Sequence, residues 1–444
     1  MKKILLIQPA YPYGKKQIYL GESLYIVAAQ LMYCGFEVDV VDLNMSPIPD
    51  TKNYDYFGIT ITGAPYIPVA LQIIQKLPNV PVLLGGQPIA VLEEEVFAEI
   101  FGSNVVQIKT DADISKVLGI ELSQIPTPYK TLVKNAYELI PEENLKEYLK
   151  HEGALFISQG CHFKCAFCAA AKGRVEQFKD LDLFYEDLLF LAEKAVKFGI
   201  LKLEFYATNL DFFQNPTEIC KYLEHSRLVQ EKTGVKIKIR CLACLTSFLK
   251  AEKIIPDLKK KCKDGGLWCI GFGVDGTDPA VWKAQKKTQN NLEDVATCLA
   301  LCESFGIKAE ILLVMGFPQD TRLSLWRNFV SACKFVFKYK HTMLRPYLAK
   351  QFVPGNDNWK LFNNKKVFIQ NPNLFYNIDF CMIGSKFTHP RFWHRFYSNA
   401  VYLAICWIFG PFGKCATYPL LPLSRNRIWN KFAVWWNKVT PFDR

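Results

Sequence analysis

The first third of the chain alternates short apolar segments with longer amphipathic ones, and this alternation constrains the fold more than any other feature. Strands are expected at residues 3–8, 36–44, 56–62 and 80–86, and helices at residues 21–34 and 65–77. Strands that alternate with helices predict a doubly wound, Rossmann-like parallel sheet of the α/β class. Loops at the carboxyl ends of these strands, residues 9–14, 60–65 and 85–88, are expected to line a ligand crevice.

These loops contain four candidate cofactor-binding residues, which are Thr60, Thr62, Gly85 and Gly86. The two glycines would let the backbone approach a ligand closely, and a plain strand-ending turn explains them equally well. No G-x-G-x-x-G follows the first strand, which disfavours a dinucleotide-binding domain of the usual kind.

Three cysteines with a C-x3-C-x2-C spacing follow an apolar stretch at residues 154–161: Cys161, Cys165 and Cys168. Structural zinc sites use four closed ligands, so a zinc site would need Cys241 and Cys244 beside Cys165 and Cys168. A cubane iron–sulfur cluster uses one thiolate per iron, so three cysteines would hold three irons and leave the fourth open. Only the iron–sulfur interpretation explains all three cysteines.

The motif, with Phe167 directly before the last cysteine, resembles the signature of the radical S-adenosylmethionine (SAM) superfamily. The resemblance implies that Cys161, Cys165 and Cys168 ligate a [4Fe–4S] cluster and act as the catalytic metal ligands. It implies that the open iron binds the amino and carboxylate groups of SAM, which the reduced cluster then cleaves. An electron donor such as flavodoxin or ferredoxin is the implied partner.

The family resemblance also implies a partial, TIM-like β/α barrel over residues 151–357, with its site at the carboxyl ends of the strands. A proline-containing linker at residues 126–150 precedes it. Barrel strands are expected at residues 154–161, 202–210, 236–245, 267–276, 308–321 and 341–356, with helices at 183–199, 258–266 and 292–306 between them.

Several residues match positions that bind SAM in the family. The resemblance places Ala207, Thr208 and Asn209 at the SAM amino group. Arg240 is placed at the SAM carboxylate or ribose, where an arginine fits a carboxylate bidentately, although an ordinary arginine at a strand end explains it equally well.

The remaining matches lie in the later strands. Asp275 in "GFGVDG" takes the place of a ribose-binding glutamate, and Gly316 and Pro318 in "GFPQDT" match the turn that meets adenine. Lys286 and Lys287 match a family lysine before a turn, and a solvated helix end is the alternative for them.

Residues 1–125 resemble the cobalamin-binding domain that precedes the barrel in many radical SAM enzymes. The resemblance rests on the opening strand, "YDYFGITITGAP" and "PVLLGGQP". The region after the second strand reads "DLNMSPIPD", without the Asp-x-His-x-x-Gly that supplies a lower cobalt ligand. Residues 105–116 also replace the family's Gly-Glu-rich segment, which indicates a partly degenerate domain. Cobalamin is therefore an implied cofactor that the sequence leaves open.

Residues 358–444 form an aromatic, basic extension that is expected to be helical. The apolar stretch within residues 390–413 is too short to span a membrane. Residues 425–444 place tryptophans and phenylalanine opposite basic residues at helical spacing, which suits an interfacial amphipathic helix. A helix that covers the barrel mouth is the alternative. The interfacial interpretation predicts contact with the inner membrane surface and allows a lipid-like substrate.

The fifteen cysteines are an odd number scattered along 444 residues, which fits a reducing cytoplasm better than a disulfide framework. The net charge of +12 is spread along the chain, and no nucleic-acid partner is expected. Pro9 follows the first apolar run too closely for a secretory signal.

The favoured function is a cobalamin-dependent methyltransferase that acts on an unactivated carbon of a small-molecule or lipid-like substrate. A cobalamin-independent radical SAM cyclase or rearrangement enzyme is the first alternative. A tRNA methylthiotransferase is disfavoured, because such enzymes carry a second cysteine triad in the N-terminal domain and only Cys34 precedes Cys161 here. A non-catalytic cluster protein at the membrane surface is the third alternative.

Overall fold

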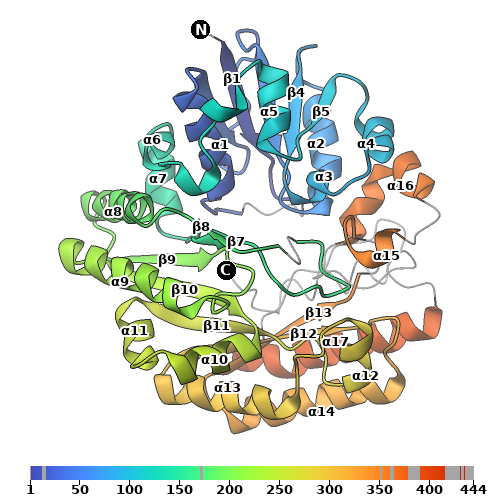
Figure 1. The fold of residues 1–444 in the computed structure, drawn as a ribbon. Coiled ribbons are helices and arrows are strands. Elements are labelled where there is room, and N and C mark those ends of the chain that lie inside the picture. Colours follow the sequence, from blue (N-terminus) through green and yellow to red (C-terminus); the bar gives the residue numbers. More distant parts are fainter. Residues whose placement is uncertain are drawn as a thin grey trace.

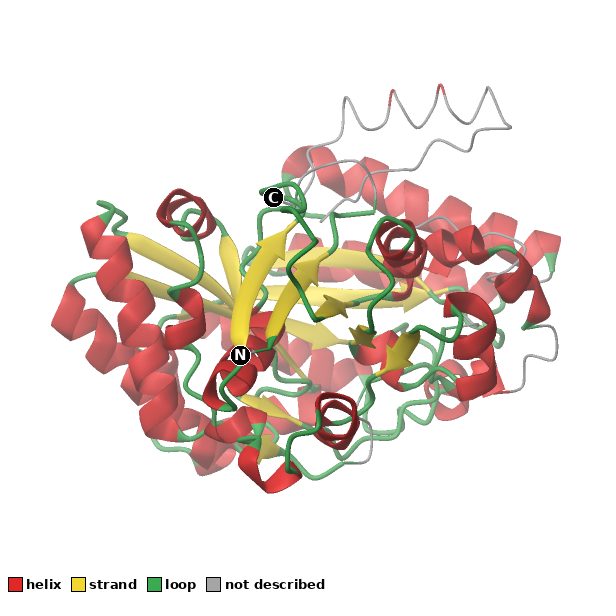
Figure 2. Ribbon diagram, turned by 90° about the horizontal axis from the view of Figure 1, so that it is seen from above, coloured by secondary structure: helices red, strands yellow, loops and turns green. Residues whose placement is uncertain are grey.

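The computed structural model describes residues 2–12, 17–170, 174–350, 353–360, 365–378 and 391–415, together with Lys431 and Trp435. Two parallel sheets organise these residues, and β7 and β8, which bracket the cysteine loop, lie between them (Figure 1). Helices surround the strands of both sheets when the molecule is seen from above (Figure 2). The predicted α/β architecture of two successive parallel layers is confirmed.

The N-terminal sheet has five parallel strands in the order β2-β1-β3-β4-β5. Its strands are β1 (Lys3–Gln8), β2 (Glu37–Asp42), β3 (Tyr56–Thr60), β4 (Val82–Gly85) and β5 (Val105–Gln107). Its helices are α1 (Glu22–Tyr33), α2 (Ile67–Ile74), α3 (Gln87–Ala90), α4 (Glu94–Phe101) and α5 (Asp111–Leu118), with a 3₁₀ turn, η1 (Ala64–Tyr66). The order reverses between β1 and β3, which is where doubly wound sheets bind ligands.

The segment at residues 105–116 is regular rather than degenerate. It forms β5 and the start of α5, and β5 pairs with β4 through Val82 and Val105. Thr110 and Asp113 form a capping box that begins α5, because each side chain satisfies backbone N–H groups that the helix leaves free. The polar "KTDAD" stretch therefore encodes a helix start.

The second sheet has six parallel strands in the order β13-β12-β11-β10-β9-β6. They are β6 (Glu152–Leu155), β9 (Lys202–Ala207), β10 (Lys236–Ala243), β11 (Leu267–Gly273), β12 (Lys308–Met315) and β13 (Thr342–Leu348). The covering helices are α8 (Leu181–Lys197), α9 (Pro216–Thr233), α10 (Leu245–Ile254), α11 (Leu258–Asp264), α12 (Pro279–Ala284), α13 (Leu292–Phe305) and α14 (Arg322–Lys338). Alternate strand residues such as Ile237 and Ile239 pack into the helical layer, so their neighbours face the barrel interior.

Two expectations for the barrel differ from the structure. The expected strand at 154–161 breaks after Leu155, and a short β7 (Ser158–Gln159) pairs antiparallel with β8 (Gln177–Phe178). Helix α14 was not expected, although Thr321 begins it with a capping box. The expected strands also run too far at their carboxyl ends, since β12 ends at Met315 and β13 ends at Leu348.

The linker and the C-terminal region pack onto both layers. The linker forms η2 (Leu122–Gln124), η3 (Pro128–Lys130), α6 (Lys134–Tyr137) and α7 (Glu142–Tyr148). After the barrel come α15 (Asp357–Lys360), α16 (Lys366–Gln370), η4 (Pro372–Ile378), α17 (Phe392–Phe409) and η5 (Gly410–Phe412). Trp359, Phe368 and Phe375 enter the core of the N-terminal sheet, so this part of the extension serves the first layer.

Among the described residues, no helix is both long enough and apolar enough to cross a membrane. The expected interfacial helix at 425–444 lies outside the described residues, apart from Lys431 and Trp435.

A buried ion cluster joins the two layers. The Lys179 ammonium lies 3.1 Å from Glu22 on α1 and 2.7 Å from Asp187 on α8. The second oxygen of Glu22 accepts the Phe156 backbone N–H at 2.5 Å, and Asp187 accepts the Val133 N–H at 2.9 Å. One lysine thus connects the N-terminal helix, the linker, the chain after β6 and the first long barrel helix.

We expect the substitution Lys179→Met to lower the free energy of unfolding by about 3–5 kcal/mol, because it leaves two buried carboxylates without their cation. Lys197→Met is the matched control, since Lys197 pairs with Glu142 on the surface and should cost about 0–1 kcal/mol. Thermal unfolding midpoints at neutral pH measure both effects. Equal midpoints for the two variants would show that the cluster does not hold the layers together.

Candidate functional site

The cysteine loop leaves the barrel through a turn that requires glycine. Gly160 has a φ of +124°, and a Cβ there would meet the Val175 carbonyl oxygen at 2.5 Å. The Cys168 N–H then donates to the Cys165 carbonyl at 3.2 Å, which closes a tight turn around Phe167. The turn places the three predicted cysteines on one short loop beyond the carboxyl end of β6.

None of the three cysteines forms a disulfide, and their thiols influence one another electrostatically. Burial raises the pKa of Cys161 to about 11, and the nearby Cys165 and Cys168 add to the increase. Burial also raises the pKa of Cys165, against the opposing effect of Lys287. Among the described residues, no three His, Cys, Asp or Glu side chains are placed to hold a single metal ion. A cubane distributes its thiolates over separate iron atoms, so three soft donors on one loop fit that cluster.

Three separate segments hold this loop in place. The Ala166 N–H donates to the Gln285 carbonyl at 3.0 Å, and the Ala166 carbonyl accepts the Asp357 N–H at 3.1 Å. From the N-terminal layer, the Gln87 amide donates to the Ala169 carbonyl at 2.5 Å. Because Gln87 begins the helix that follows β4, the carboxyl edge of the first sheet faces the cysteine loop.

A buried lysine, Lys287, lies beside the loop. Its ammonium pairs with Asp275, donates to the Gly273 carbonyl at 2.6 Å and lies 5.8 Å from the centre of the Phe167 ring. Burial alone would lower the pKa of Lys287, but Asp275 and the nearby thiols raise it above its usual range. Asp275 adopts a φ of +50°, which is unusual for a residue with a side chain. Lys286 instead pairs with Asp357 at the surface, as the solvated alternative predicted.

Ala207, Thr208 and Asn209 lie together at the carboxyl end of β9, next to β6. The Thr208 N–H donates to the Leu155 carbonyl at 3.0 Å, and the Asn209 amide donates to the Ser158 hydroxyl. The Ser158 hydroxyl in turn donates a hydrogen bond to Glu176 at 2.5 Å. Burial raises the pKa of the Glu176 carboxyl. The sequence analysis did not identify Glu176.

Buried polar atoms without partners gather around the loop. Among the described residues they include Asn209 Oδ1, Gln285 Oε1, Gln289 Nε2 and Asn290 Oδ1. Buried donors and acceptors normally have partners, so both kinds together indicate a polar ligand at this place. The sequence analysis identified Asn209 but did not identify Gln285, Gln289 or Asn290. These three residues lie in the polar run "QKKTQNN", which could have indicated a binding segment.

The turn after β12 supports the loop from the other side. Asp320 accepts the Gly316 N–H at 2.8 Å and the Phe317 N–H at 2.9 Å, and the Phe317 ring lies 5.4 Å from the Phe167 ring. Pro318 is half-buried in the same turn. Gly316 has a φ of +85°, so it is the residue type the turn requires. Asp320 therefore holds the "GFPQDT" turn together through these two hydrogen bonds, a role that the sequence analysis did not predict.

The structure does not bring Arg240 to the cysteines. Its guanidinium forms two hydrogen bonds with Glu152, at 2.8 and 2.7 Å, and lies 3.7 Å from Glu310. Glu310 also accepts two hydrogen bonds from Arg345, at 2.5 and 3.0 Å. Glu152 begins β6, whereas the cysteines follow its end, so these charges lie deeper in the barrel interior.

Cys244, placed by the sequence in a strand, lies beyond the end of β10 and beside the loop. Its thiol interacts with those of Cys161 and Cys165, and its N–H donates to Asp211 at 2.9 Å. Cys241 is buried in the apolar core on the helical side of β10. This placement disfavours the alternative zinc site, which needs both cysteines.

The four candidate residues of the N-terminal layer lie at the expected edge. Thr60 and Gly85 are paired neighbours at the carboxyl ends of β3 and β4. Gly86 has a φ of +111°, and a Cβ there would clash with the backbone of Ile61. The chain itself therefore requires glycine at position 86. Thr62 is exposed beyond β3.

Asn44 occupies the third position of "DLN", where a histidine would stand in the cobalt-ligating motif. Its oxygen accepts the Tyr11 N–H at 2.8 Å, and its amide donates to Asp42 at 2.8 Å and to the Pro9 carbonyl at 3.4 Å. Asn44 therefore holds the loop after β1 and does not point a ligand into the crevice.

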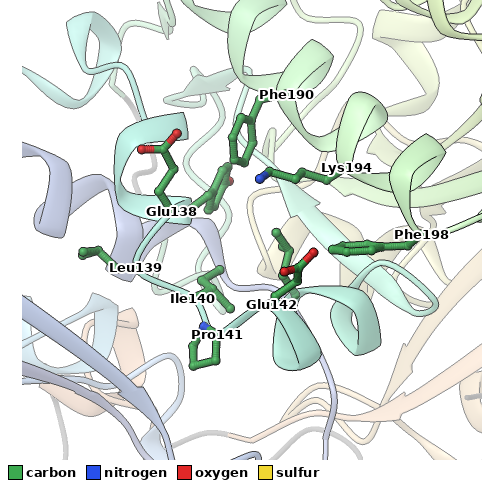
Figure 3. Close-up of a pocket in the computed structure, with 10 residues that line it drawn as sticks. Glu138, Leu139, Ile140, Pro141, Glu142, Phe190, Lys194 and Phe198 are labelled. Atoms are coloured by element: carbon green, nitrogen blue, oxygen red, sulfur yellow. The ribbon is translucent and has the colours of Figure 1, made fainter.

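A surface cavity of about 510 Å³ lies elsewhere, between the linker and α8 (Figure 3). Glu138 and Glu142 border it from the linker, and Lys194 extends into it between Phe190 and Phe198. Its lining includes no cysteine, so it is separate from the candidate site.

Comparison with solved structures identifies the fold. No family model and no curated protein matches the chain. The radical SAM methyltransferase TsrM from Kitasatospora setae, solved with cobalamin and a [4Fe–4S] cluster, matches with a TM-score of 0.61 at 16% identity, over 81% of this chain and 77% of TsrM. The cobalamin-dependent SAM radical enzyme OxsB matches with a TM-score of 0.54 at 16% identity, over 83% of this chain and 56% of OxsB. The chain thus has the fold of cobalamin-dependent radical SAM enzymes, as the resemblance predicted.

We expect the barrel-interior charges to make stability depend on pH. Burial alone would raise the pKa of Glu310, but Arg345 and Arg240 hold it below its usual range. The ionised Glu310 carboxylate therefore stabilises the folded protein fully above pH 4.5, the ordinary pKa of glutamate. This stabilisation is lost as the pH falls through the lower pKa of Glu310 in the folded state. Glu310→Gln should lower the free energy of unfolding by about 3 kcal/mol at pH 7. This difference from the wild type should shrink below pH 4.5.

Thermal unfolding of both proteins between pH 7 and pH 3 measures this difference. Glu224→Gln is the control, because Glu224 pairs with Arg227 at the surface. A difference for Glu310→Gln that stays constant with pH would contradict the assignment.

Proposed function

We propose that the protein is a radical SAM enzyme whose Cys161, Cys165 and Cys168 hold a [4Fe–4S] cluster. The observation that carries this proposal is the convergence of three cysteine thiols and several unpartnered buried polar atoms on one loop at the barrel mouth. The shared fold with TsrM and OxsB supports it. When bound, the cluster supplies the electron that cleaves SAM.

The residues around the loop have separate roles in this proposal. Asn209 Oδ1 would accept a hydrogen bond from the amino group of SAM, and Gln289 Nε2 would donate one to its carboxylate. Lys287 places a buried positive charge near the Cys165 thiol, which favours the thiolate form that binds iron. Phe167 and Phe317 pack together and would shield one side of the loop from water. Asp275 orients Lys287 through their ion pair.

We propose cobalamin as the second cofactor, held at the carboxyl edge of the N-terminal sheet by the loops of Thr60, Thr62, Gly85 and Gly86. The contact of Gln87 with Ala169 supports this place, because it joins that edge to the cysteine loop. Asn44 is engaged with backbone groups and with Asp42, so it would not ligate cobalt from below. When bound, cobalamin supplies a carrier for a methyl group.

The reaction that fits both cofactors is methyl transfer from SAM to an unactivated carbon of a small molecule, with flavodoxin or ferredoxin as the electron donor. Cyclisation or rearrangement without cobalamin is the second candidate, since the first sheet lacks a lower cobalt ligand. Both candidates share the cysteine site and differ in the need for the first sheet.

We expect anaerobically reconstituted protein to cleave SAM to 5′-deoxyadenosine when dithionite is supplied, and to retain cobalamin through gel filtration. Chromatography of the products and visible spectra measure the two outcomes. SAM cleavage without retained cobalamin would favour the second candidate. Failure to cleave SAM by protein with an intact cluster would contradict the enzyme proposal.

We expect Cys165→Ser to remove most of the bound iron, because it removes one of three ligands. Cys244→Ser should keep the iron content of the wild type, although Cys244 lies beside the same loop. Iron assay and the cluster absorption band compare the two variants after identical reconstitution. Equal iron loss in both variants would indicate a four-cysteine site instead.

A further inference from the structure

Two neighbouring helices of the barrel side carry a single sign of charge. Residues 322–341, which contain α14, include five lysines and arginines and no acidic residue. Residues 391–415, which contain α17, include three and again no acidic residue. Neither segment contains an aspartate or a glutamate that could balance its lysines and arginines, so both segments carry a net positive charge.

Helices α14 and α17 lie side by side and run in the same direction. At their amino ends the Arg322 guanidinium lies 4.5 Å from the centre of the Tyr397 ring. At their carboxyl ends the Phe337 and Phe409 rings lie 5.9 Å apart. Figure 1 shows both helices in the barrel half of the molecule, away from the N-terminal sheet, with α14 at the lower edge. Their exposed sides therefore form one continuous surface.

Large apolar side chains stand out from this surface. Trp326, Phe392, Trp393 and Phe396 near the amino ends are each between 51% and 61% exposed. Phe337, Trp407 and Phe412 near the carboxyl ends are exposed even further. Phe392, Trp393 and Phe396 contact one another rather than the core. Exposed apolar patches of this kind mark interaction sites.

We propose that this surface, the basic aromatic face of α14 and α17, docks on a membrane that contains anionic lipids. Tryptophan and phenylalanine rings partition into the boundary between headgroups and acyl chains, and lysines and arginines are attracted to anionic headgroups. The face combines both properties on two helices that lie in one plane. This proposal is independent of the proposed catalytic function.

Among the described residues, the acidic groups that border the face offset only part of its charge. Asp278 pairs with Arg327 at 3.2 Å, and Glu303 accepts the Lys340 backbone N–H at 3.1 Å. Asp320 is buried in the turn after β12 and is occupied by backbone N–H groups. At the amino ends of the helices, Arg322 lies 4.5 Å from the centre of the Tyr397 ring and Arg395 lies 5.9 Å from the centre of the Phe392 ring.

The face is directly connected to the cysteine loop. The Phe317 carbonyl contacts His394 Nε2 of α17 at 2.8 Å, and the Phe317 ring lies against Phe167. A Cβ on Gly316 would lie 3.1 Å from the Ser398 hydroxyl, so α17 and the turn after β12 are closely packed. Docking through α17 would therefore place the barrel mouth near the lipid surface.

The test is flotation of the full chain with two kinds of vesicle, pure phosphatidylcholine and phosphatidylcholine with a third phosphatidylglycerol. We expect at least about tenfold more protein bound to the anionic vesicles at low salt, and a loss of that difference at high salt. The double variants Trp393→Ala/Phe396→Ala and Arg391→Glu/Arg395→Glu should each reduce binding about tenfold or more.

Matched control variants change exposed residues elsewhere. Tyr33→Ala/Leu201→Ala removes two exposed apolar side chains, and Lys259→Glu/Lys260→Glu reverses two exposed charges on α11. We expect both controls to bind as the wild type does. All variants should keep the wild-type thermal unfolding midpoint, because the changed side chains lie at the surface.

Three outcomes would overturn the proposal. One is the absence of vesicle binding by the full chain, and another is equal loss of binding in the test and control variants. The third is binding of a single-stranded RNA oligonucleotide that depends on the same residues while vesicles stay unbound, which would assign the face to nucleic acid.

Discussion

The buried ammonium of Lys179 is the interaction on which the arrangement of the two layers depends. It contacts Glu22 from the first sheet's α1 and Asp187 from the barrel's α8, and both carboxylates also bind backbone N–H groups. A buried ion cluster adds little net stability over an apolar one, but it accepts only one geometry. The distance between the two sheet mouths therefore follows from the packing of one lysine.

That spacing gives the cysteine loop its environment. The loop receives hydrogen bonds from Gln87 of the first layer and contacts Gln285 of the second, so neither layer alone would shape it. The unpartnered amide atoms of Asn209 and Asn290 come from loops that are distant in the sequence. A polar ligand at the loop would bind groups that follow β9 and β11, so its binding would depend on how these two segments pack beside the loop.

Much of the fold was predictable because it depends on local periodicity. The strands near residues 3–8 and 236–245 were identified from apolar alternation, and the three cysteines from their spacing. Arg240 could not be placed correctly, because its partners Glu152 and Glu310 are remote in sequence and draw it into the barrel interior. Asp320 and Glu176 were missed for the related reason that single carboxylates carry no pattern until their partners are known.

The sequence by itself determined the alternation of strands and helices and the three-thiolate donor set, because both are written in short spacings along the chain. Only the tertiary structure decided that Lys287 lies beside the loop, that Cys244 approaches it while Cys241 turns away, and that α14 and α17 run side by side. These features depend on which distant segments pack together. A local pattern specifies which face of an element is apolar, but packing in three dimensions selects the partner.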